Sequence, residues 1–416
     1  MTKNKIMPEI RFKGFTDDWK QDEFENVFYH LQNNSFSRAQ LSYENGEVLN
    51  VHYGDILVEY GECLDVNKAL IPKIIDNNSL DKYLTSYLEN GDVIIADAAE
   101  DESVGKCCEI IGFNNEKILS GLHTIPCRPS VKFASGYLGY YMNSDSYHDQ
   151  LLPLMQGTKV NSISKSALTN TYICYPPNIE EQKKVATFFS NLDDLITLQY
   201  RKLDKLIIVK KSMLDKMFPI EGESVPEVRF SGFNDTWETR KLGECFSERV
   251  ESMPDGELIS VTINNGVKKF SELGRHDNSN DDKSKYKKVC VGDIAYNSMR
   301  MWQGASGYSP YEGIVSPAYT VLAPNAGVDS KCISYLFKRP DMIQKFQINS
   351  QGITSDNWNL KYPALSDIEI LISKDYQEQK RIAEYFSYLD DLITLQQRKV
   401  EKLRNIKSSC MERMFV

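Results

Sequence analysis

Two long segments of the chain carry apolar residues at intervals of three and four, separated by polar residues. This spacing is typical of a helix that buries one stripe of its surface against a partner. The segments are residues 180–219 and 377–416, and at a rise of 1.5 Å per residue each helix would be about 60 Å long. The predicted seam consists of Phe189, Leu192, Ile196, Gln199, Leu203 and Leu206 in the first segment and Phe386, Leu389, Ile393, Gln396, Val400 and Leu403 in the second.

These two segments are copies of one another. The stretch EEQKKVATFFSNLDDLITLQ in the first aligns without a gap to QEQKRIAEYFSYLDDLITLQ in the second. A second pair of copies opens each half of the chain, since residues 8–28 match residues 226–246. Repetition of this kind indicates an internal duplication. The chain therefore consists of a repeated frame that holds two unlike inserts, at about 29–179 and 247–376.

The direction of the helices follows from the spacing of the copies. Polar residues interrupt the seam at matching places, as Gln199 and Gln396 show, and such residues can fix the register and partner of a helix pair. Only seven residues lie between Phe218 and Pro226, so the second insert begins where the first helix ends. We therefore predict that the two helices pair antiparallel as a coiled coil, which returns the C-terminus to the first insert.

The inserts combine short apolar runs after Gly-Asp turns with short helical stretches. The runs predict strands at residues 54–58, 91–95 and 292–296. The helical stretches lie at residues 137–143 and 333–337. The expected fold class is α+β, with two α/β insert domains, a pair of long antiparallel coiled-coil helices and a pseudo-twofold internal repeat.

Composition narrows the class of protein. At 416 residues, with 41% hydrophobic and 26% charged residues, the chain suits a soluble protein of two domains. It has no apolar run long enough to span a bilayer and no secretory signal, and its nine cysteines form no CxxC pair. We expect a cytoplasmic protein without membrane contact. A net charge of −9, taken alone, argues against nucleic-acid binding, because phosphate contacts need Lys or Arg. Binding depends on a local patch and not on the total charge, and a partner subunit can also supply the positive surface.

Signatures of catalysis are missing from the sequence. It contains no GxGxxG, no Walker-type phosphate loop and no HExxH, and its five histidines have no ligand spacing. The pairs Asp193-Asp194 and Asp390-Asp391 are adjacent residues, which do not share a helix face, so they suit polar-face or partner contacts. We predict no catalytic residue, no metal site and no enzymatic activity in this chain.

The acidic residues that begin each repeated helix have a simple interpretation. Glu181 and Glu378 recur in the same Glu-Gln-Lys triplet at the start of the two segments. Negative charge is favourable near a helix N-terminus, because the unpaired amides there carry partial positive charge. We therefore interpret both residues as stabilising the helix starts.

The arrangement resembles the specificity subunit of Type I restriction–modification enzymes over the whole chain. The resemblance rests on the Arg-Phe-x-Gly-Phe-x-x-x-Trp openings at 11–19 and 229–237, the helix starts EEQKKVA and QEQKRIA, and the shared core Leu-Asp-Asp-Leu-Ile-Thr-Leu-Gln. It implies four parts. These are a first target recognition domain at 1–179, a first conserved helix at 180–219, a second target recognition domain at 220–376 and a second conserved helix at 377–416.

The resemblance also implies a function. Each recognition domain would read one half of a bipartite target in double-stranded DNA, and the helices would set the gap between the halves. Two methyltransferase (modification) subunits and the restriction (translocase and nuclease) subunits would be recruited to methylate adenine or to cleave unmodified DNA. S-adenosylmethionine, ATP and Mg would belong to those partners, with no cofactor in this chain.

Residues that read DNA bases are expected in polar loops. Direct readout uses Arg or Lys for guanine, Asn or Gln for adenine and Asp or Glu for cytosine. The candidates in the first insert are Lys106, Gln156, Gly157, Thr158, Lys159, Asn161 and Ser162. The candidates in the second insert are Asn297, Ser298, Arg300, Trp302, Gln303, Gln351, Gly352, Thr354, Ser355, Asn357 and Trp358. Trp302 and Trp358 could instead be core residues, and the acidic run 97–102 could either read cytosine amino groups or be solvated.

Two other function classes remain open. One is a non-catalytic, two-headed protein scaffold without DNA readout, which would show no sequence-dependent DNA binding once its partner is present. The other is an enzyme with a cryptic site, which the purified chain would reveal by its own activity. Neither class explains why the frame is kept twice while the inserts differ.

Overall fold

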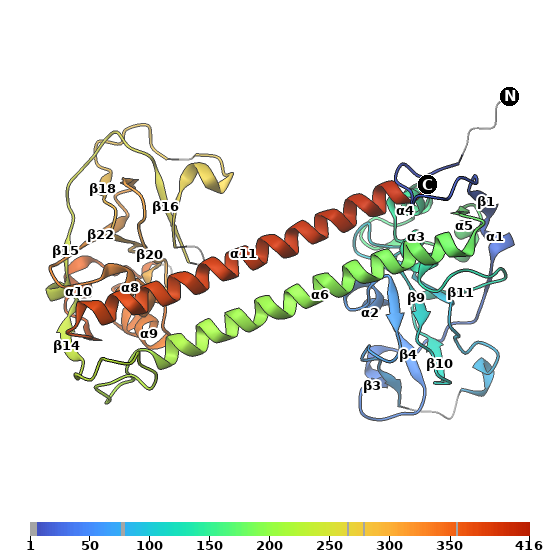
Figure 1. Cartoon of the computed structure of the whole chain (residues 1–416), viewed down its shortest axis with the longest axis horizontal. Helices are drawn as coiled ribbons and strands as arrows, with labels where there is room; N and C mark the ends of the chain where they lie inside the picture. Colours follow the sequence, from blue (N-terminus) through green and yellow to red (C-terminus); the bar gives the residue numbers. More distant parts are fainter. Residues whose placement is uncertain (1–5, 76–79, 264–265, 278, 355–356) are drawn as a thin grey trace. The chain divides into compact units, whose positions relative to one another are not determined.

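The computed structural model describes residues 6–75, 80–263, 266–277, 279–354 and 357–416. It divides into two compact units, which we call unit 1 (Met1–Tyr200 with Arg398–Val416) and unit 2 (Arg201–Gln397). The two repeated segments are long helices, α6 over Ile179–Lys216 and α11 over Tyr376–Met414 (Figure 1). Each unit therefore contains the first part of one long helix and the last part of the other.

In unit 1 the start of α6 packs beside the end of α11. The rings of Phe189 and Phe415 stack with their centroids 5.6 Å apart. Lys407 donates to Asp193 at 2.5 Å and to Glu62 at 2.8 Å. Because residues from the start of one helix contact residues from the end of the other, the two helices run antiparallel here.

Unit 2 repeats this arrangement with the helices exchanged. The rings of Phe218, after the end of α6, and Phe386, near the start of α11, stack with centroids 6.2 Å apart. Lys210 of α6 forms an ion pair with Asp390 of α11. The predicted antiparallel pairing is therefore confirmed within each unit, and the second aspartate pair, like the first, contributes an interhelical contact.

The predicted seam positions share one environment. All twelve are buried or half-buried, while neighbours on other faces, such as Asp194 and Arg201, are exposed. Gln396 is itself buried. An amide in such a seam needs a hydrogen-bond partner, which is the physical reason that a polar seam residue can fix helix register.

Unit 1 is built around a five-stranded sheet in the order β2-β11-β7-β9-β5, in which only β5 and β9 are parallel. Its strands are β2 (Phe28–His30), β11 (Thr124–Pro129), β7 (Val93–Ala96), β9 (Cys107–Ile111) and β5 (Cys63–Asp65). A second sheet has β10 (Ile118–Ser120), β4 (Leu49–Val51), β6 (Lys73–Ile74) and β3 (Leu41–Ser42). Two further pairs join β1 (Lys20–Glu23) to β13 (Tyr172–Tyr175) and β8 (Ala98–Ala99) to β12 (Asn161–Ser162). The short helices are α1 (Phe24–Val27), α2 (Tyr53–Val58), α3 (Tyr137–Met142), α4 (Asp145–Leu151) and α5 (Lys165–Leu168).

Unit 2 has a four-stranded antiparallel sheet in the order β15-β22-β19-β20. Its strands are β15 (Phe246–Glu248), β22 (Tyr319–Pro324), β19 (Ile294–Asn297) and β20 (Ser306–Tyr308). Three pairs surround it: β14 (Glu238–Lys241) with β23 (Glu369–Ile372), β16 (Ile259–Thr262) with β17 (Gly266–Lys269), and β18 (Lys287–Val289) with β21 (Gly313–Val315). Its short helices are α7 (Leu242–Cys245), α8 (Ser330–Leu336), α9 (Pro340–Ile348) and α10 (Tyr362–Ser366).

The two inserts share one frame. The pairs β1/β13 and β7/β11 of unit 1 correspond to β14/β23 and β19/β22 of unit 2, with the same antiparallel pairing. Helices α3 and α8 also correspond, because Tyr140 of α3 donates to Asp193 as Tyr335 of α8 donates to Asp390. The predicted strands at 91–95 and 292–296 and the helices at 137–143 and 333–337 are confirmed.

The predicted strand at residues 54–58 is wrong, because this segment forms helix α2. The side chain of His52 accepts a hydrogen bond from the amide of Gly54 and caps the helix. Ile56 is fully buried while Val58 is 78% exposed, so only one face of the helix packs on the sheet. A short apolar run does not distinguish a strand from a helix.

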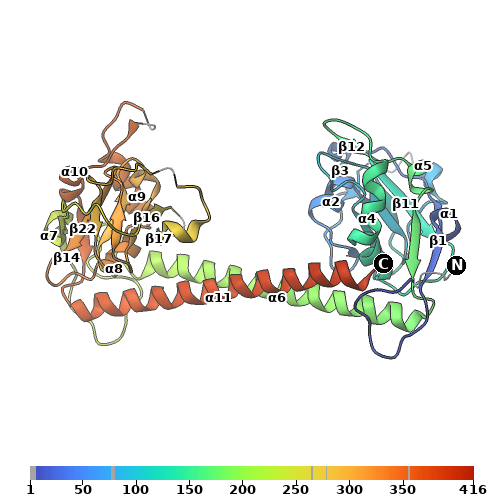
Figure 2. The same ribbon diagram turned by 90° about the horizontal axis from the view of Figure 1, so that it is seen from above.

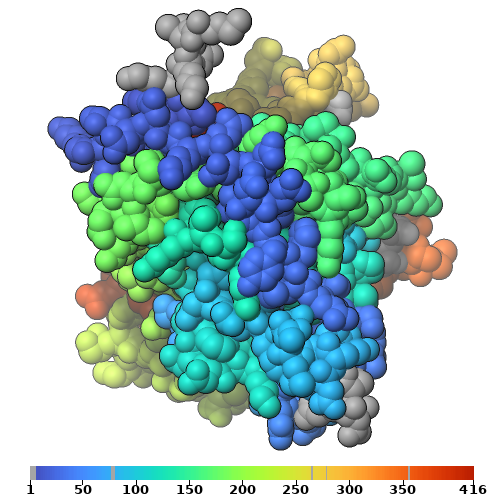
Figure 3. Space-filling view, turned by 90° about the vertical axis from the view of Figure 1, so that its right-hand side faces the viewer, coloured from blue at the N-terminus to red at the C-terminus, as the bar shows by residue number. Residues whose placement is uncertain are grey.

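The interpretation of Glu181 and Glu378 as helix-start charges is incomplete. Arg11 of the opening segment donates to both carboxylate oxygens of Glu181, at 2.6 and 2.9 Å, and the Glu181 side chain is only 1% exposed. In the second copy Arg229 binds Glu378 in the same way, at 2.6 and 2.8 Å. Figure 3 shows the opening segment, in blue, lying over the start of α6, in green. The acids therefore fasten each opening segment to its long helix.

Candidate nucleic-acid interface

The two predicted segments of unit 1 lie together although about sixty residues separate them in the sequence. Strand β8, which follows β7, pairs antiparallel with β12, so Ala99 faces Asn161. The amide of Ile163 donates to the carbonyl of Asp97 at 2.9 Å. The Asn161 side chain donates to the carbonyl of Asp101 at 3.2 Å. One continuous surface therefore joins the loop after β7 to the loop that precedes β12.

The loop before β12 is closed by its own backbone. Gln156 and Ser162 exchange two hydrogen bonds, at 2.9 and 2.8 Å. Gly157 has φ +134°, and a Cβ at this position would lie 1.9 Å from the carbonyl oxygen of Val160, so only glycine fits the turn. Thr158 and Lys159 are exposed. The backbone fixes the loop and leaves polar side chains free to contact a ligand.

Unit 2 contains the equivalent loop. Gln351 and Asn359 exchange two backbone hydrogen bonds, at 3.0 and 2.8 Å. Gly352 has φ +148°, and a Cβ there would lie 2.6 Å from the carbonyl oxygen of Asn357. The amide of Leu360 donates to the carbonyl of Ser298 at 2.9 Å, as Ile163 donates to Asp97 in unit 1. The candidates Thr354 and Asn357 lie in this loop and hydrogen-bond each other. Ser355 lies outside the described residues.

Two tryptophans join the predicted segments of unit 2. The rings of Trp302 and Trp358 meet edge to face with centroids 5.2 Å apart, and Trp302 also donates to the carbonyl of Met299 at 3.1 Å. Both side chains are half-buried and neither belongs to a core cluster among the described residues. The pair therefore braces the loop after β19 against the loop at 351–359.

The remaining candidates differ in accessibility. Asn297 accepts from the amide of Met299 at 3.0 Å, Arg300 is exposed and Gln303 is half-buried. Ser298 is only 7% exposed and shares a hydrogen bond with Thr320. Lys106 is half-buried and donates to the carbonyl of Leu57 at 2.8 Å. Arg300 is thus open to solvent, whereas Ser298 is largely covered.

A second contact fixes the far end of the loop after β19. Lys338, just beyond α8, donates to the carbonyls of Gly304 and Ser306 at 2.7 and 2.8 Å. Burial lowers the pKa of Lys338 to about 8. In unit 1 the residue beyond α3 is Asn143, whose side chain binds both backbone groups of Cys107. An amide and an ammonium group therefore perform the same positioning task in the two units.

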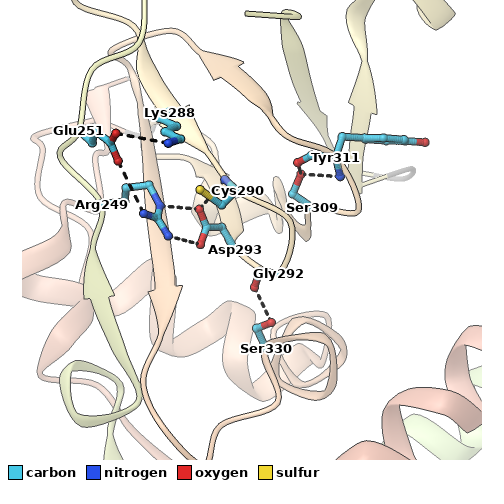
Figure 4. A network of polar contacts seen from close by, with 9 residues as sticks. All are labelled: Arg249, Glu251, Lys288, Cys290, Gly292, Asp293, Ser309, Tyr311 and Ser330. Carbon is cyan, nitrogen blue, oxygen red and sulfur yellow. Dashed lines mark hydrogen bonds and ion pairs between the residues drawn. The ribbon is translucent and has the colours of Figure 1, made fainter.

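The beginning of β19 is anchored by a network of ion pairs (Figure 4). Arg249 binds both oxygens of the buried Asp293, at 2.7 and 3.0 Å, and this bond raises the pKa of Arg249. Asp293 also accepts from the amide of Cys290 at 2.7 Å. In unit 1 Arg128 holds Asp92 with two hydrogen bonds of 2.8 Å. The loop after β7 and the loop after β19 thus each leave a strand whose opposite end is fixed by an arginine bound to a buried aspartate.

The structure places further polar residues beside the candidates. A groove in unit 2 is lined by Ser298, Met299, Thr320, Asn359, Lys287 and Lys361. Lys287 and Lys361 come from separate elements, so no local pattern could bring them together. In unit 1, His123 lies beside Asp97 with Nδ1 3.2 Å from the carboxylate. For Lys287 the sequence does offer a signal, because it belongs to a run of lysines (283, 285, 287 and 288) that suits either phosphate contacts or a solvated surface. Lys361 and His123 carry no signal beyond their polarity.

The loops occupy one side of each unit. In unit 1, β12 lies on the side away from the start of α6, and in unit 2 the orange loop between α9 and α10 projects away from α11 (Figure 2).

Within the described parts of the chain, no group of three or more His, Cys, Asp or Glu residues is placed to hold a metal ion. None of the helices in those parts is long and apolar enough to cross a membrane. The arrangement is suited to recognition by polar loops.

Comparison with known proteins agrees with this division into two similar halves. The sequence matches the family model described as Type I restriction modification DNA specificity domain over residues 42–207 and 234–405. Each matched span covers most of an insert and much of the helix that follows it.

Two relatives come from Methanocaldococcus jannaschii. The chain is 22% identical over 412 residues to the MjaX specificity subunit of a type I restriction enzyme, with 95% of this chain and 92% of the relative covered. It is 25% identical over 282 residues to the type I restriction enzyme MjaVIII specificity subunit, with 62% and 64% covered.

Solved structures share the fold. The S subunit of a Type-I restriction-modification system from M. genitalium has a TM-score of 0.60 at 12% identity, with 99% of both chains covered. A chain from a study of complex assembly and conformational transition in the type I R-M system has a TM-score of 0.53 at 15% identity, covering 95% of this chain and 97% of that one. Because the family model accounts for most of the sequence, the chain belongs to the family of Type I restriction modification DNA specificity domains.

Proposed function

We propose that this chain reads a bipartite target in double-stranded DNA, with residues 1–179 and 220–376 as the two recognition domains. The observation that carries the proposal is the internal duplication of the site. Each unit brings a loop after a central strand against a Gln-Gly loop through the same backbone hydrogen bond, Ile163 to Asp97 or Leu360 to Ser298. The frame is the same and the loop side chains differ, as two different half-sites require.

The loop chemistry supports base readout. In unit 2 the exposed Arg300 is a donor suited to guanine, and Gln351 and Asn357 have amides suited to adenine. In unit 1, Gln156 and Lys159 present the same two kinds of group. Phosphate contacts from lysines such as Lys361 would position the duplex without adding sequence information.

The chain would act as a non-catalytic subunit in the cytoplasm. Two modification subunits would bring S-adenosylmethionine and methylate adenine, and restriction subunits would bring ATP and Mg and cleave unmodified DNA. The relatives named as specificity subunits support assembly into such a complex. The opening segments and the exposed faces of the long helices are the natural docking sites, because both copies present them in the same form.

The test maps the methylation that this chain directs in a host that has no DNA methylation of its own. The chain is expressed with a cognate modification subunit, and methyladenine is mapped by single-molecule sequencing. A split motif that disappears when this chain is omitted is the expected result. Replacing residues 247–376 by another insert should change one half only. A stable complex that produces no split motif would contradict the proposal and favour a protein scaffold.

Shortening both long helices tests their role in setting the gap. Removing about one turn from each, at matching places, shortens each helix by about 5.4 Å, roughly one to two base pairs of DNA. We expect the methylated motif to keep both half-sites and to lose one or two base pairs of the gap. A change in the half-sites at constant gap would contradict a spacing role.

Substituting the loop glycines should affect one half-site at a time. Gly157→Ala forces a Cβ against the carbonyl of Val160 and imposes an unfavourable backbone, at a cost of about 1–3 kcal/mol. We expect roughly tenfold to hundredfold weaker binding to duplexes that carry the first half-site, and Gly352→Ala should do the same for the second. Gly61→Ala is the control, because nothing lies within 4 Å of its Cβ. Equal effects of Gly157→Ala on both half-sites would argue against separate reading loops.

A further inference from the structure

His123 occupies a strained position beside the reading loop of unit 1. Its φ is +54°, and among the described residues other than glycine only Asn115 shares a positive φ. A side chain in the left-handed region costs free energy, so it persists where surrounding contacts determine it. Here the amide of Asp97 donates to the carbonyl of His123 at 3.1 Å, directly before β11 begins. The strain is therefore located where the loop after β7 begins.

The imidazole is held on two sides. Its Nδ1 lies 3.2 Å from Oδ1 of Asp97, and its ring meets the ring of Tyr53 edge to face with centroids 5.3 Å apart. Tyr53 is packed in turn against His52, whose ring centroid lies 4.7 Å away. The side chains of His123 and Asp97 remain 51% and 28% exposed. A fixed imidazole–carboxylate pair is therefore presented to solvent beside the paired strands β8 and β12.

In unit 2, different residues occupy the positions that correspond to Asp97 and His123. In unit 2 the amide of Ser298 donates to the carbonyl of Ala318 at 3.3 Å, the same bond that joins Asp97 to His123 in unit 1. Ser298 and Ala318 line the groove that also contains Thr320. At identical places in one frame, unit 1 carries a carboxylate and an imidazole, and unit 2 carries a hydroxyl and a methyl group.

We propose that Asp97 and His123 form a specificity-determining pair of the first recognition domain, in which the Asp97 carboxylate accepts a hydrogen bond from the exocyclic amino group of a base. This inference rests on the proposed function. His123 would act as a positioning residue, because its hydrogen bond fixes the direction of the carboxylate. Cytosine N4 and adenine N6 are the amino groups in the major groove, and an acidic side chain suits the first of them best.

The electrostatics of Asp97 agree with such a role. Burial raises the pKa of Asp97, and the neighbouring His123 opposes this rise. The imidazole thereby favours the ionised carboxylate, which has acceptors only and discriminates against bases that offer acceptors at the same place. The other acids of the run, such as Glu100, are exposed.

The experiment measures base preference at each position of the first half-site. The complex of the full chain with modification subunits is bound to duplexes randomised in that half, with the second half kept constant. We expect Asp97→Asn to reduce the preference for the amino-bearing base at one position by about tenfold to hundredfold. His123→Ala should weaken preference at that same position. His123→Asn should restore much of it, because asparagine tolerates a positive φ and can donate to the carboxylate.

Matched variants separate this inference from the proposed function. Glu100→Gln, on the same loop, should leave all preferences unchanged, and Ser298→Ala should leave the first half unchanged. Retained preference for the second half-site shows that each variant is folded and assembled. If Asp97→Asn keeps the wild-type base preference at every position of the first half-site, the role of the Asp97–His123 pair is overturned, while the proposed reading of a bipartite target is unaffected. If the wild-type complex shows no sequence preference in either half, both fail.

Discussion

Replacing Arg229 by methionine should lower the free energy of unfolding of unit 2 by about 3–5 kcal/mol, the usual cost of leaving a buried charge without its partner. Glu378 is 1% exposed and accepts two hydrogen bonds from Arg229, with further bonds from Trp237 and Ser373. Without the guanidinium, the carboxylate would be buried with neutral donors alone. Urea unfolding followed by hydrogen exchange of α8 measures the loss in unit 2.

Two controls decide whether burial is the cause. Lys216→Met removes the exposed ion pair with Glu227, in which both side chains are more than 40% exposed, and should cost under about 1 kcal/mol. Adding Glu378→Gln to Arg229→Met removes the unpaired charge and should recover a large part of the loss. Arg11→Met should destabilise unit 1 in the same way through Glu181. Equal effects of Arg229→Met and Lys216→Met would refute the explanation.

The stability of unit 1 should depend on Glu109 between about pH 4.5 and 7. This carboxyl lies in the interior and accepts from the amides of Gly136 and Gly139, at 2.6 and 2.9 Å, where α3 begins. Burial raises the pKa of Glu109 from its usual 4.5 to about 7, although those amide bonds oppose the rise. In this window the folded chain binds the proton and the unfolded chain has released it. Stability therefore falls as pH rises, by about 3 kcal/mol across the window at 1.36 kcal/mol for each pH unit.

Glu109→Gln provides the comparison, because glutamine keeps the shape and cannot ionise. The unfolding free energy of the wild type, measured relative to that of Glu109→Gln at the same pH, should fall by about 3 kcal/mol from pH 4.5 to 7 and then stay constant. Hydrogen exchange of α3 reports on unit 1. Helix α8 of unit 2 serves as the reference, since Asp329 caps it locally by accepting from Cys332 at 2.8 Å. Parallel pH profiles for the two proteins would show that Glu109 does not carry this dependence.

The comparison of Glu109 with Asp329 shows how the duplicated frame has diverged. At the start of α8, Asp329 accepts from the amide of Cys332, three residues later in the sequence. At the start of α3, the amide of Gly136 instead donates to Glu109, which comes from the distant strand β9. A second example is the contact of Asn143 with β9 and of Lys338 with β20, in which different side chains bind equivalent strands. The frame thus tolerates different side chains wherever the backbone group that needs a partner still receives one.

Repetition and periodicity by themselves predicted much of the architecture. The two long helices follow from spacings of three and four, and their antiparallel pairing follows from the short link between Phe218 and Pro226. The α+β inserts follow from short apolar runs after turn residues, and the family resemblance rests on the motifs at 11–19 and 229–237 and on the shared helix starts. The helix α2 was missed because a short apolar run has no distinct period, and a histidine before the run is not a recognisable start signal for a helix.

Only the tertiary structure decided how the candidate site is assembled. The pairing of β8 with β12, the contact between Trp302 and Trp358, and the position of His123 beside Asp97 join residues that lie far apart in the sequence. The burial of Glu181 under Arg11 is of the same kind. Such contacts depend on backbone hydrogen bonds and on side chains that meet only after the chain has folded. Polar residue types carry no periodic signal, so the sequence indicated which loops to consider and the fold determined which residues meet.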